Sequence, residues 1–322
     1  MKCAICGKEA IYVRPYDNLT LCLPHFNNQM EKRVRTTITK YKLLGREDKI
    51  AVGLSGGKDS VALLHLLSKI EQDYPDTEIV AITIDEGIEN YREEGLSLAK
   101  KHAQKLNLEH HIFSFEDDFG YSLDEIIDVL GERGKERAYG ACSYCGILRR
   151  KLLNYGAKKI GATVLATGHN LEDEAETVLL NILRGDIIRL ARIDPVPKKM
   201  NDSLIPRIKP FRLTPQAEIV LYCYINDLEY QEIPCPYAVE AYRGNIRDFV
   251  VNTQNEQPML SYNIVGSHDK LLALLKDVKM EKSMKECACG DVTAGTQCKA
   301  CWLKNKVEKI KSIKNETNEN RV

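Results

Sequence analysis

Six consecutive residues carry the clearest chemical signal in this sequence. Residues 55–60 read Ser-Gly-Gly-Lys-Asp-Ser and lie between an apolar run and an amphipathic segment. The glycines let backbone amides approach phosphate oxygens, and the following helix would add favourable charge at its N-terminus. A P-loop NTPase has Ser or Thr after the lysine to hold Mg²⁺, whereas this chain has Asp59 after Lys58. A carboxylate there can hold Mg²⁺ on a leaving pyrophosphate, so the motif favours cleavage of ATP to AMP.

Two groups of cysteines have the spacing of zinc ligands. The first consists of two short-spaced pairs near the amino terminus, Cys3, Cys6, Cys22 and His25. The second repeats this pattern near the other end, with one pair a residue shorter than usual: Cys287, Cys289, Cys298 and Cys301. Paired ligands on tight turns suit tetrahedral Zn²⁺, so we expect a structural zinc ion in each group. The alternative for the second is a loosened site with three cysteine ligands.

Four of the eleven cysteines remain. Cys223 lies in an apolar helical stretch and is expected to be a buried, unreactive side chain. Cys142 and Cys145 precede a basic segment, and Cys235 stands between two prolines that fix its backbone. The pair Cys142 and Cys145 could be a redox dithiol, half of another zinc site, or part of an iron–sulfur cluster. Three thiolates without a fourth ligand would leave one iron of a 4Fe–4S cluster open.

Composition and charge exclude some classes of protein. The chain has 322 residues, 43% hydrophobic, which suggests about two domains with additions. A net charge of zero argues against a uniformly basic nucleic-acid binder. However, residues 133–159 and 182–212 each hold eight Lys or Arg. These stripes either attract a polyanion or are solvated helix faces.

The cellular location follows from what the sequence lacks. The amino terminus has no apolar signal segment, and no apolar run is long enough to span a membrane. We therefore expect a cytoplasmic protein without a membrane partner. Cysteines in such a reducing compartment are more often metal ligands than disulfides.

The elements that must position these residues follow from hydrophobic periodicity. Apolar strands are expected over 50–54, 79–84, 110–113 and 163–167. Helical patterns follow over 59–71, 91–106, 122–130 and 172–184. This alternation predicts an α/β fold with a doubly wound parallel sheet. A basic amphipathic helix over 31–46 would join the first zinc ribbon to this core, and another helix would begin near Pro215.

Several motifs together resemble a known family. SGGKDS after a strand is the signature of the PP-loop ATP pyrophosphatases. The chain also contains AITIDEGI, CSYCGILRR, LATGHNLEDEAET, GDIIRLAR and CPYA, flanked by ribbons at both ends. This combination is similar to the TtuA/NcsA family of PP-loop tRNA 2-thiouridine synthetases.

The resemblance implies a tRNA uridine 2-sulfurtransferase. Such an enzyme adenylates the C2 oxygen of uridine with ATP and Mg²⁺, and then replaces it with sulfur delivered through a 4Fe–4S cluster, releasing AMP. An alternative within the family uses the cysteines as persulfide carriers. The implied catalytic residues are Asp59, Cys142, Cys145 and Cys235, the three cysteines being the cluster ligands. The implied nucleotide-binding residues are Gly53, Leu54, Ser55, Gly56, Gly57, Lys58, Asp59, Ser60, Ile84, Asp85, Gly168, His169 and Asp173. Arg149 and Arg150 could face phosphates or be surface charges.

The resemblance also implies partners and an organisation of the chain. The partners are tRNA, a sulfur donor (free sulfide or a ubiquitin-like thiocarboxylate protein), and a second copy in a homodimer. The modified uridine stays open between the wobble position and the T-loop, with His25 favouring the latter. The expected segments are a ribbon (1–30), a linker helix (31–47), the PP-loop core (48–213), a substrate-facing helical region (214–280), a ribbon (281–304) and a polar, partly disordered tail (305–322).

Three other functions compete with this interpretation. Another PP-loop nucleotide ligase would use an amine nucleophile and need no cysteine triad. A tRNA cytidine thiolase would share the loop and the cysteines, but the flanking ribbons favour the uridine branch. A zinc-ribbon RNA-binding protein would have no use for an intact phosphate loop.

Overall fold

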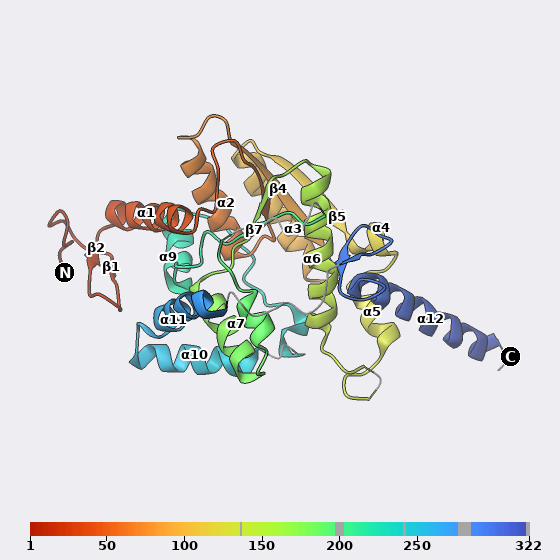
Figure 1. The fold of residues 1–322 in the computed structure, drawn as a ribbon. Coiled ribbons are helices and arrows are strands. Elements are labelled where there is room, and N and C mark those ends of the chain that lie inside the picture. Colours follow the sequence, from red (N-terminus) through yellow and green to blue (C-terminus); the bar gives the residue numbers. More distant parts are fainter. Residues whose placement is uncertain (136, 197–202, 241–242, 276–284, 320–322) are drawn as a thin grey trace.

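A five-stranded parallel sheet forms the centre of the protein (Figure 1). The structure is a computed structural model that describes residues 1–135, 137–196, 203–240, 243–275 and 285–319. The sheet order is β5-β4-β3-β6-β7. Its strands are β3 (Lys49–Gly53), β4 (Glu78–Asp85), β5 (Glu109–Ser114), β6 (Val164–Ala166) and β7 (Arg207–Ile208). The order reverses between β3 and β6, and ligands of doubly wound folds bind at such a point. The predicted doubly wound α/β fold is confirmed.

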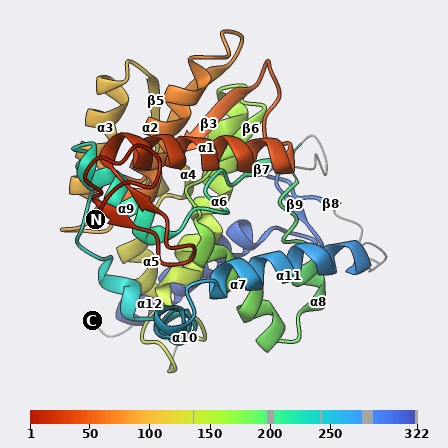
Figure 2. The same ribbon diagram turned by 90° about the vertical axis from the view of Figure 1, so that its left-hand side faces the viewer.

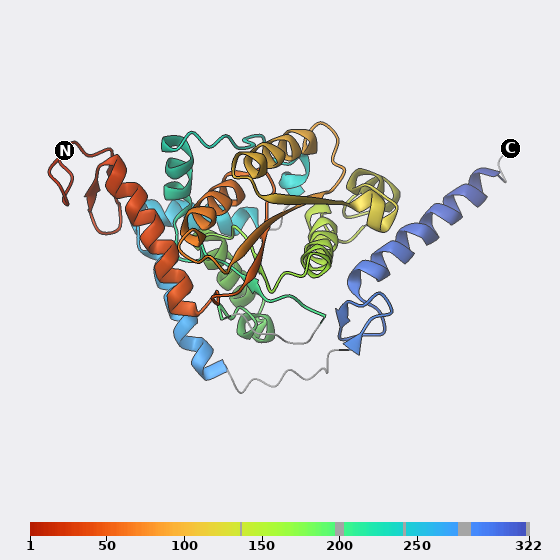
Figure 3. The same ribbon diagram turned by 90° about the horizontal axis from the view of Figure 1, so that it is seen from above.

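Helices cover both faces of this sheet (Figure 3). Helices α2 (Lys58–Glu71) and α3 (Arg92–Lys105) lie on one face, and α6 (Ala141–Lys159) lies on the other. Successive strand residues enter opposite cores: Val52 packs with α2, whereas Ala51 packs with α6. Because both faces are buried, the strands read as continuous apolar runs.

The remaining elements surround this core. The other helices are α1 (Leu23–Tyr41), α4 (Phe115–Phe119), α5 (Leu123–Leu130), α7 (Leu171–Leu183), α8 (Ile187–Ala191), α9 (Gln216–Ile225), η1 (Pro236–Glu240), α10 (Gly244–Glu256), α11 (Leu260–Leu275) and α12 (Lys299–Glu319). Short hairpins are formed by β1 (Tyr12–Val13) with β2 (Thr20–Leu21), and by β8 (Lys285–Glu286) with β9 (Val292–Thr293). Helices α10 and α11 pack against α7 (Figure 2). Within the described ranges, no helix combines the length and apolarity that crossing a bilayer requires.

Two helices differ from the expected ranges. Helix α1 begins at Leu23 rather than near residue 31, because Cys22 is its N-cap residue and a proline occupies its first turn. Helix α12 extends to Glu319, although we expected a partly disordered tail from residue 305. Leu303 and Val307 of this helix are fully buried with the core residues of α5 and α6, and this packing accounts for the helix.

The expected segment boundaries stay a prediction. Ile219 and Cys223 of α9 are fully buried in the same core as α2, so the start of the 214–280 segment packs on the PP-loop core. The buried position expected for Cys223 is confirmed. Residues 276–284, at the expected junction with the second ribbon, lie outside the described residues. So does part of the basic stripe over 182–212.

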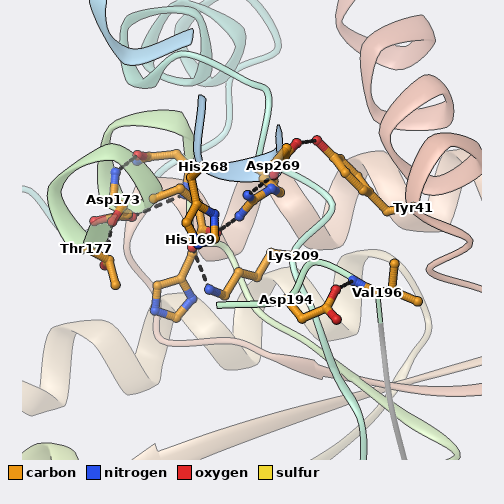
Figure 4. A network of polar contacts seen from close by, with 12 residues as sticks. Tyr41, His169, Asp173, Thr177, Asp194, Val196, Lys209, His268 and Asp269 are labelled. Atoms are coloured by element: carbon orange, nitrogen blue, oxygen red, sulfur yellow. Dashed lines mark hydrogen bonds and ion pairs between the residues drawn. The ribbon is translucent and has the colours of Figure 1, made fainter. Parts of the chain in front are cut away.

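A buried ionic network ties α7 to α11 and α1 (Figure 4). The Arg212 guanidinium, 1% exposed, pairs with Glu174 and lies 2.6 Å from Asp269 Oδ1. Lys209 Nζ also reaches Glu174 Oε1 at 2.5 Å, and Tyr41 donates to Asp269 Oδ2 at 2.5 Å. The network fixes the segment after β7 against the helix that follows β6.

Arg212→Ala should lower the free energy of unfolding by about 3–5 kcal/mol, because it leaves buried carboxylates without their main partner. A Glu174→Met, Arg212→Met double variant should lose less than the single variant, because the fully buried Glu174 charge is removed together with its partner and the charges left behind, Lys209 and Asp269, are partly exposed. Urea unfolding followed by circular dichroism measures both. A cost below about 1 kcal/mol for Arg212→Ala would mean that this pair does not hold the elements together.

Candidate functional site

The loop between β3 and α2 is held in a fixed conformation by its own side chains. Gly56 has φ +88°, and a Cβ there would lie 2.3 Å from the carbonyl oxygen of Gly95 in α3, so only glycine fits. Ser60 Oγ accepts from the Ser55 amide at 3.0 Å and donates to the Gly57 carbonyl at 2.8 Å. Helix α2 begins directly afterwards, at Lys58. Its N-terminal amides therefore face the sheet edge in a loop already shaped for an anion.

Asp59 lies where this loop meets the loop after β6. Its Oδ2 is 2.7 Å from Lys58 Nζ, and its Oδ1 accepts from Asn170 Nδ2 at 3.0 Å. A Cβ on Gly168 would lie 2.9 Å from the Asp59 carbonyl oxygen, so the two loops touch only because residue 168 is glycine. Asp173 fixes Asn170 in turn through a capping box at the start of α7. Both strand ends therefore orient the Asp59 carboxylate.

A pocket of about 340 Å³ opens at this edge. Nine of the residues expected to bind the nucleotide line it: Gly53, Leu54, Ser55, Asp59, Ser60, Ile84, Gly168, His169 and Asp173. Four expected residues are not among the lining residues: Gly56, Gly57, Lys58 and Asp85. The Gly56 carbonyl accepts instead from the Gln231 amide at 2.9 Å, and Asp85 Oδ1 accepts from the Gly87 amide at 2.9 Å. These two residues shape the loops around the pocket.

His169 lines the pocket from the loop after β6. Its Nδ1 forms a hydrogen bond with Thr167 Oγ1 at 2.9 Å. The His169 side chain is exposed at the pocket mouth, and crowding by its neighbours, followed by the positive charge of Lys209, lowers its pKa. Figure 4 shows His169 beside Lys209.

Sequence reasoning missed the charged side chains of the pocket wall. The additional lining residues are Ile82, Glu86, Arg92, Leu153, Thr167 and Arg243, together with Arg149, for which two roles were open. Glu86, only 5% exposed, lies 2.8 Å from Arg92 Nε and 2.7 Å from Arg149 Nε. Arg92 also donates to the Ser55 carbonyl at 2.7 Å. A buried carboxylate between two arginines thus connects the phosphate loop to α6. In the sequence, the only sign of this role is that Glu86 belongs to the DEGI motif at the end of β4.

Arg149 continues this connection to the cysteines of α6. Its Nη2 lies 3.0 Å from Cys145 Sγ. Cys142 and Cys145 are three residues apart in the first turns of the helix, so they share a face. Cys235 comes just before η1, which packs against α6, and Cys142 Sγ lies 3.4 Å from the Tyr237 carbonyl oxygen. The phosphate pocket and the three cysteines are therefore neighbours.

The η1 segment is fastened to the start of α6 by an ion pair. Arg137 donates to both carboxylate oxygens of Glu240, at 2.6 and 2.8 Å, and the Ala141 amide donates to Glu240 at 2.7 Å. These contacts lower the pKa of Glu240 to about 2, with the Arg137 hydrogen bond as the main cause. These contacts hold the segment of Cys235 against α6, although Cys235 lies about ninety residues after Cys145 in the chain.

The three thiols fit a cluster better than a single metal ion. None is in a disulfide; Cys142 is exposed, Cys145 buried and Cys235 between these extremes. They are not among the groups of described residues whose ligand atoms all lie within 4.8 Å of one another, the spacing that one ion requires. Burial raises the pKa of Cys145 to about 11 although Arg149 opposes the shift, and a metal bound to the sulfur would favour the thiolate further. A polynuclear iron–sulfur cluster is consistent with both observations.

Four ligand atoms converge at the amino terminus. Cys3 Sγ and Cys22 Sγ lie 3.4 and 3.2 Å from His25 Nδ1, and Cys6 Sγ lies 3.7 Å from Cys22 Sγ. All four atoms are within 4.8 Å of one another, which suits a tetrahedral metal ion. Because Cys22 and His25 belong to the first turn of α1, the ribbon is continuous with that helix.

The second group converges despite its shorter first pair. Its four sulfur atoms lie within 4.8 Å of one another, with Cys289 and Cys298 Sγ 3.6 Å apart. Lys151 Nζ from α6 lies 2.7 Å from Cys289 Sγ and 3.8 Å from Cys298 Sγ. Four thiolates around a Zn²⁺ ion would carry a net negative charge, which this lysine would offset. The contact also joins the second ribbon to the helix that carries Cys142 and Cys145 (Figure 1).

Cys289→Ser should lower the bound zinc by about one ion per chain, since it removes one of four converging ligands and leaves the other group intact. Zinc is measured by atomic emission after chelator treatment. Cys223→Ser, which changes a cysteine outside both groups, is the matched control and should keep all of its zinc. Full retention of zinc in Cys289→Ser would favour a site with three cysteine ligands.

Comparison with known proteins agrees with this arrangement. The PP-loop domain family matches residues 26–254. The chain is 38% identical to cytoplasmic tRNA 2-thiolation protein 1 of Saccharomyces cerevisiae, over 98% of this chain and 89% of that one. It is 36% identical to the tRNA 2-thiolation protein NcsA of Haloferax volcanii, over 96% of this chain and all of that one.

A solved structure shares the fold as well as the sequence. The U34-tRNA thiolase NcsA of Methanococcus maripaludis, determined with its 4Fe–4S cluster, is 33% identical and superposes with a TM-score of 0.75. The match covers 87% of this chain and 90% of that one. With the phosphate loop at the sheet edge and three cysteines beside it, the chain belongs to the PP-loop family, in the group that contains the tRNA 2-thiolation proteins.

Proposed function

We propose that this protein is an ATP-dependent tRNA sulfurtransferase that replaces the C2 oxygen of a tRNA uridine with sulfur. The observation that carries the proposal is the short connection from the phosphate loop through Glu86 and Arg149 to Cys145. An ATP site without a neighbouring thiol group would suit any PP-loop ligase. The relatives named as tRNA 2-thiolation proteins support the choice of substrate.

In the first step, the C2 oxygen of uridine attacks the α-phosphorus of ATP, and pyrophosphate leaves. The loop of residues 55–60 would bind the phosphates, and Asp59 is placed to hold a Mg²⁺ ion, which would supply positive charge against them. Lys58, 2.7 Å from the Asp59 carboxylate, offsets charge that develops on the pyrophosphate. The product is uridine with AMP attached through its C2 oxygen.

In the second step, hydrosulfide attacks C2, and AMP leaves with the former C2 oxygen. The new carbon–sulfur bond replaces the carbon–oxygen bond, and the proton of hydrosulfide goes to solvent or pyrophosphate. Cys142, Cys145 and Cys235 would hold a 4Fe–4S cluster, which when bound supplies an iron without a cysteine ligand that can carry the sulfur. Arg149, between Cys145 and the pocket, is placed to stabilise negative charge during the transfer.

The solved relative points to the uridine that is modified. That protein is described as acting on U34, the wobble position, whereas His25 suggested the T-loop. We propose position 34, because the comparison covers most of both chains and one zinc ligand is a weaker guide. Free sulfide or a ubiquitin-like thiocarboxylate protein would supply the sulfur. A homodimer and one structural Zn²⁺ in each ribbon complete the proposal.

One anaerobic reaction tests this function. Cluster-reconstituted protein is mixed with ATP, Mg²⁺, sulfide and unmodified tRNA, and nucleosides and nucleotides are identified by mass spectrometry. We expect 2-thiouridine and AMP to appear together, and fragment mapping to place the modification at position 34. AMP without a thiolated base would favour another PP-loop ligase, and 2-thiocytidine would identify a cytidine thiolase. If neither product forms, the assignment is wrong.

A further inference from the structure

Three arginines from separate elements gather beside the pocket, on the face of the sheet that α6 covers. Arg207 pairs in register with Leu165, which packs under α6, so its side chain points to that helix. The segment before it is fastened to α6: Asn154 Nδ2 donates to the Ser203 carbonyl at 2.9 Å, and its Oδ1 accepts from the Ile205 amide at 2.9 Å. Arg150 lies one helical turn before Asn154, close enough for its charge to act on Arg207.

The third arginine is Arg243, the residue that precedes α10. It lines the ATP pocket and donates to Thr177 Oγ1 at 2.7 Å. The positive charges of Arg243 and Arg149 both act on Arg150, and that of Arg150 acts on Arg207. We call Arg150, Arg207 and Arg243 the arginine cluster.

Among the described residues, the arginine cluster has no counter-ion. In the part of the chain that the structure describes, none of its three members forms an ion pair with a carboxylate. Three nearby acids already bind other cations: Glu174 binds Lys209 and Arg212, Glu86 binds Arg92 and Arg149, and Glu176 binds Arg247. Asp173 lines the same pocket as Arg243, but it forms no ion pair with the cluster among the described residues.

The environment of Arg207 is energetically unfavourable. Its Nε is buried and has no hydrogen-bond partner. Lost hydration, followed by the charge of Arg150, lowers the pKa of Arg207 to about 10. A buried donor without a partner and repulsion between like charges both destabilise the fold, and a bound anion would relieve both.

We propose that the arginine cluster binds a phosphodiester group of the substrate RNA next to the reacting nucleotide. This inference rests on the proposed function, because it takes RNA to be the substrate. Guanidinium groups bind phosphate through paired, charge-assisted hydrogen bonds, and such contacts fix the register of a nucleic acid on a protein. A phosphate held here would place the adjoining base at the mouth of the ATP pocket, which Arg243 borders.

The phosphates of ATP are a less suitable ligand for this cluster. Their loop follows β3, whereas Arg207 lies on β7, two strands away in the sheet order and hence about 10 Å distant. Arg150 and Arg207 do not line the pocket that the loop forms. A polymer that carries a phosphate at every nucleotide can reach both places at once.

Binding of unmodified tRNA to Arg150→Gln and Arg207→Gln proteins tests the proposal, with fluorescence anisotropy over a range of salt concentrations. Each substitution should weaken binding about tenfold. Each should also reduce the slope of log Kd against log salt concentration by about one. ATP affinity, measured by calorimetry, should not change. The melting temperature should stay the same or rise, because repulsion is removed. Arg46→Gln, an exposed arginine before β3, is the matched control and should keep wild-type binding.

The outcomes separate the two proposals. If the wild-type protein neither binds nor thiolates tRNA, the proposed function fails. If it does both and the two variants bind tRNA as the wild type does, only the arginine cluster is misassigned. A loss of ATP affinity with tRNA binding unchanged would mean that the cluster serves the nucleotide, and would overturn the inference.

Discussion

Thiolation of tRNA should fall by about 10²–10³-fold or more when Asp59 is replaced by alanine, while the protein stays folded. The carboxylate is the group best placed to hold Mg²⁺ on the leaving pyrophosphate, since Lys58 and Asn170 fix its two oxygens at 2.7 and 3.0 Å. Its side chain is only 26% exposed and points to the pocket. Formation of AMP and of 2-thiouridine should fall together, because both depend on the same first step.

The Asp59→Asn variant separates the contribution of the negative charge at residue 59 from that of the size and hydrogen bonding of its side chain. Asparagine keeps an oxygen for the Asn170 hydrogen bond but lacks the negative charge that Mg²⁺ needs. We therefore expect the asparagine variant to lose as much thiolation as the alanine variant and to melt closer to the wild type. Loss of the favourable charge at the start of α2 should cost about 1 kcal/mol of stability in either variant. Thiolation near the wild-type rate in Asp59→Asn would remove the metal-holding role from the mechanism.

Features set by local sequence were predictable. The strands that end at Gly53 and Asp85 are short apolar runs followed by polar turns, and both end at the edge where the pocket opens. The zinc ligands come in pairs a few residues apart, so each half-site is formed by one turn of chain. Short-range patterns of this kind predict local structure independently of the tertiary contacts that form elsewhere in the fold.

Features that depend on distant contacts were not predictable. Glu86 looks like any acidic residue after a strand, and its role arises only because Arg92 and Arg149 meet it from two helices. Strand β7 has two residues, too few for a periodic signal, and exists because it pairs with β6. Helix α6 contains two glycines and a mixed face, which obscured it in the sequence, yet it carries the cysteines and both of the following arginines.

The boundaries of α1 and α12 illustrate the same limit. Helical periodicity predicts that α1 begins after the first ribbon, but His25, an expected ligand of zinc, is itself in the first turn of the helix. The polar sequence after residue 305 was expected to lack structure, because few of its residues are apolar. Burial of Leu303 and Val307 against the core is enough to continue the helix.

Iron should be lost and zinc retained when Cys235 is replaced by alanine. Cys142 and Cys145 lie on one helix, so in the proposed cluster Cys235 would be the ligand that approaches from the other side. Two thiolates on one face cannot complete the three-cysteine set that leaves a single iron open. The zinc groups share no residue with it. Iron after anaerobic reconstitution should therefore fall from about four per chain to below about one, and the visible absorption of the cluster should disappear.

Cys223→Ala is the matched control, because it removes a cysteine that is fully buried in α9 and belongs to no metal group. It should keep both metals. Formation of AMP distinguishes the two stages of the reaction in Cys235→Ala: adenylation needs the loop of residues 55–60 and no cysteine, so AMP should still appear through hydrolysis of the activated base, without 2-thiouridine. If Cys235→Ala retained its iron and lost only sulfur transfer, the three thiols would be persulfide carriers. If it retained both, sulfur would reach the uridine by a route that does not involve this cysteine.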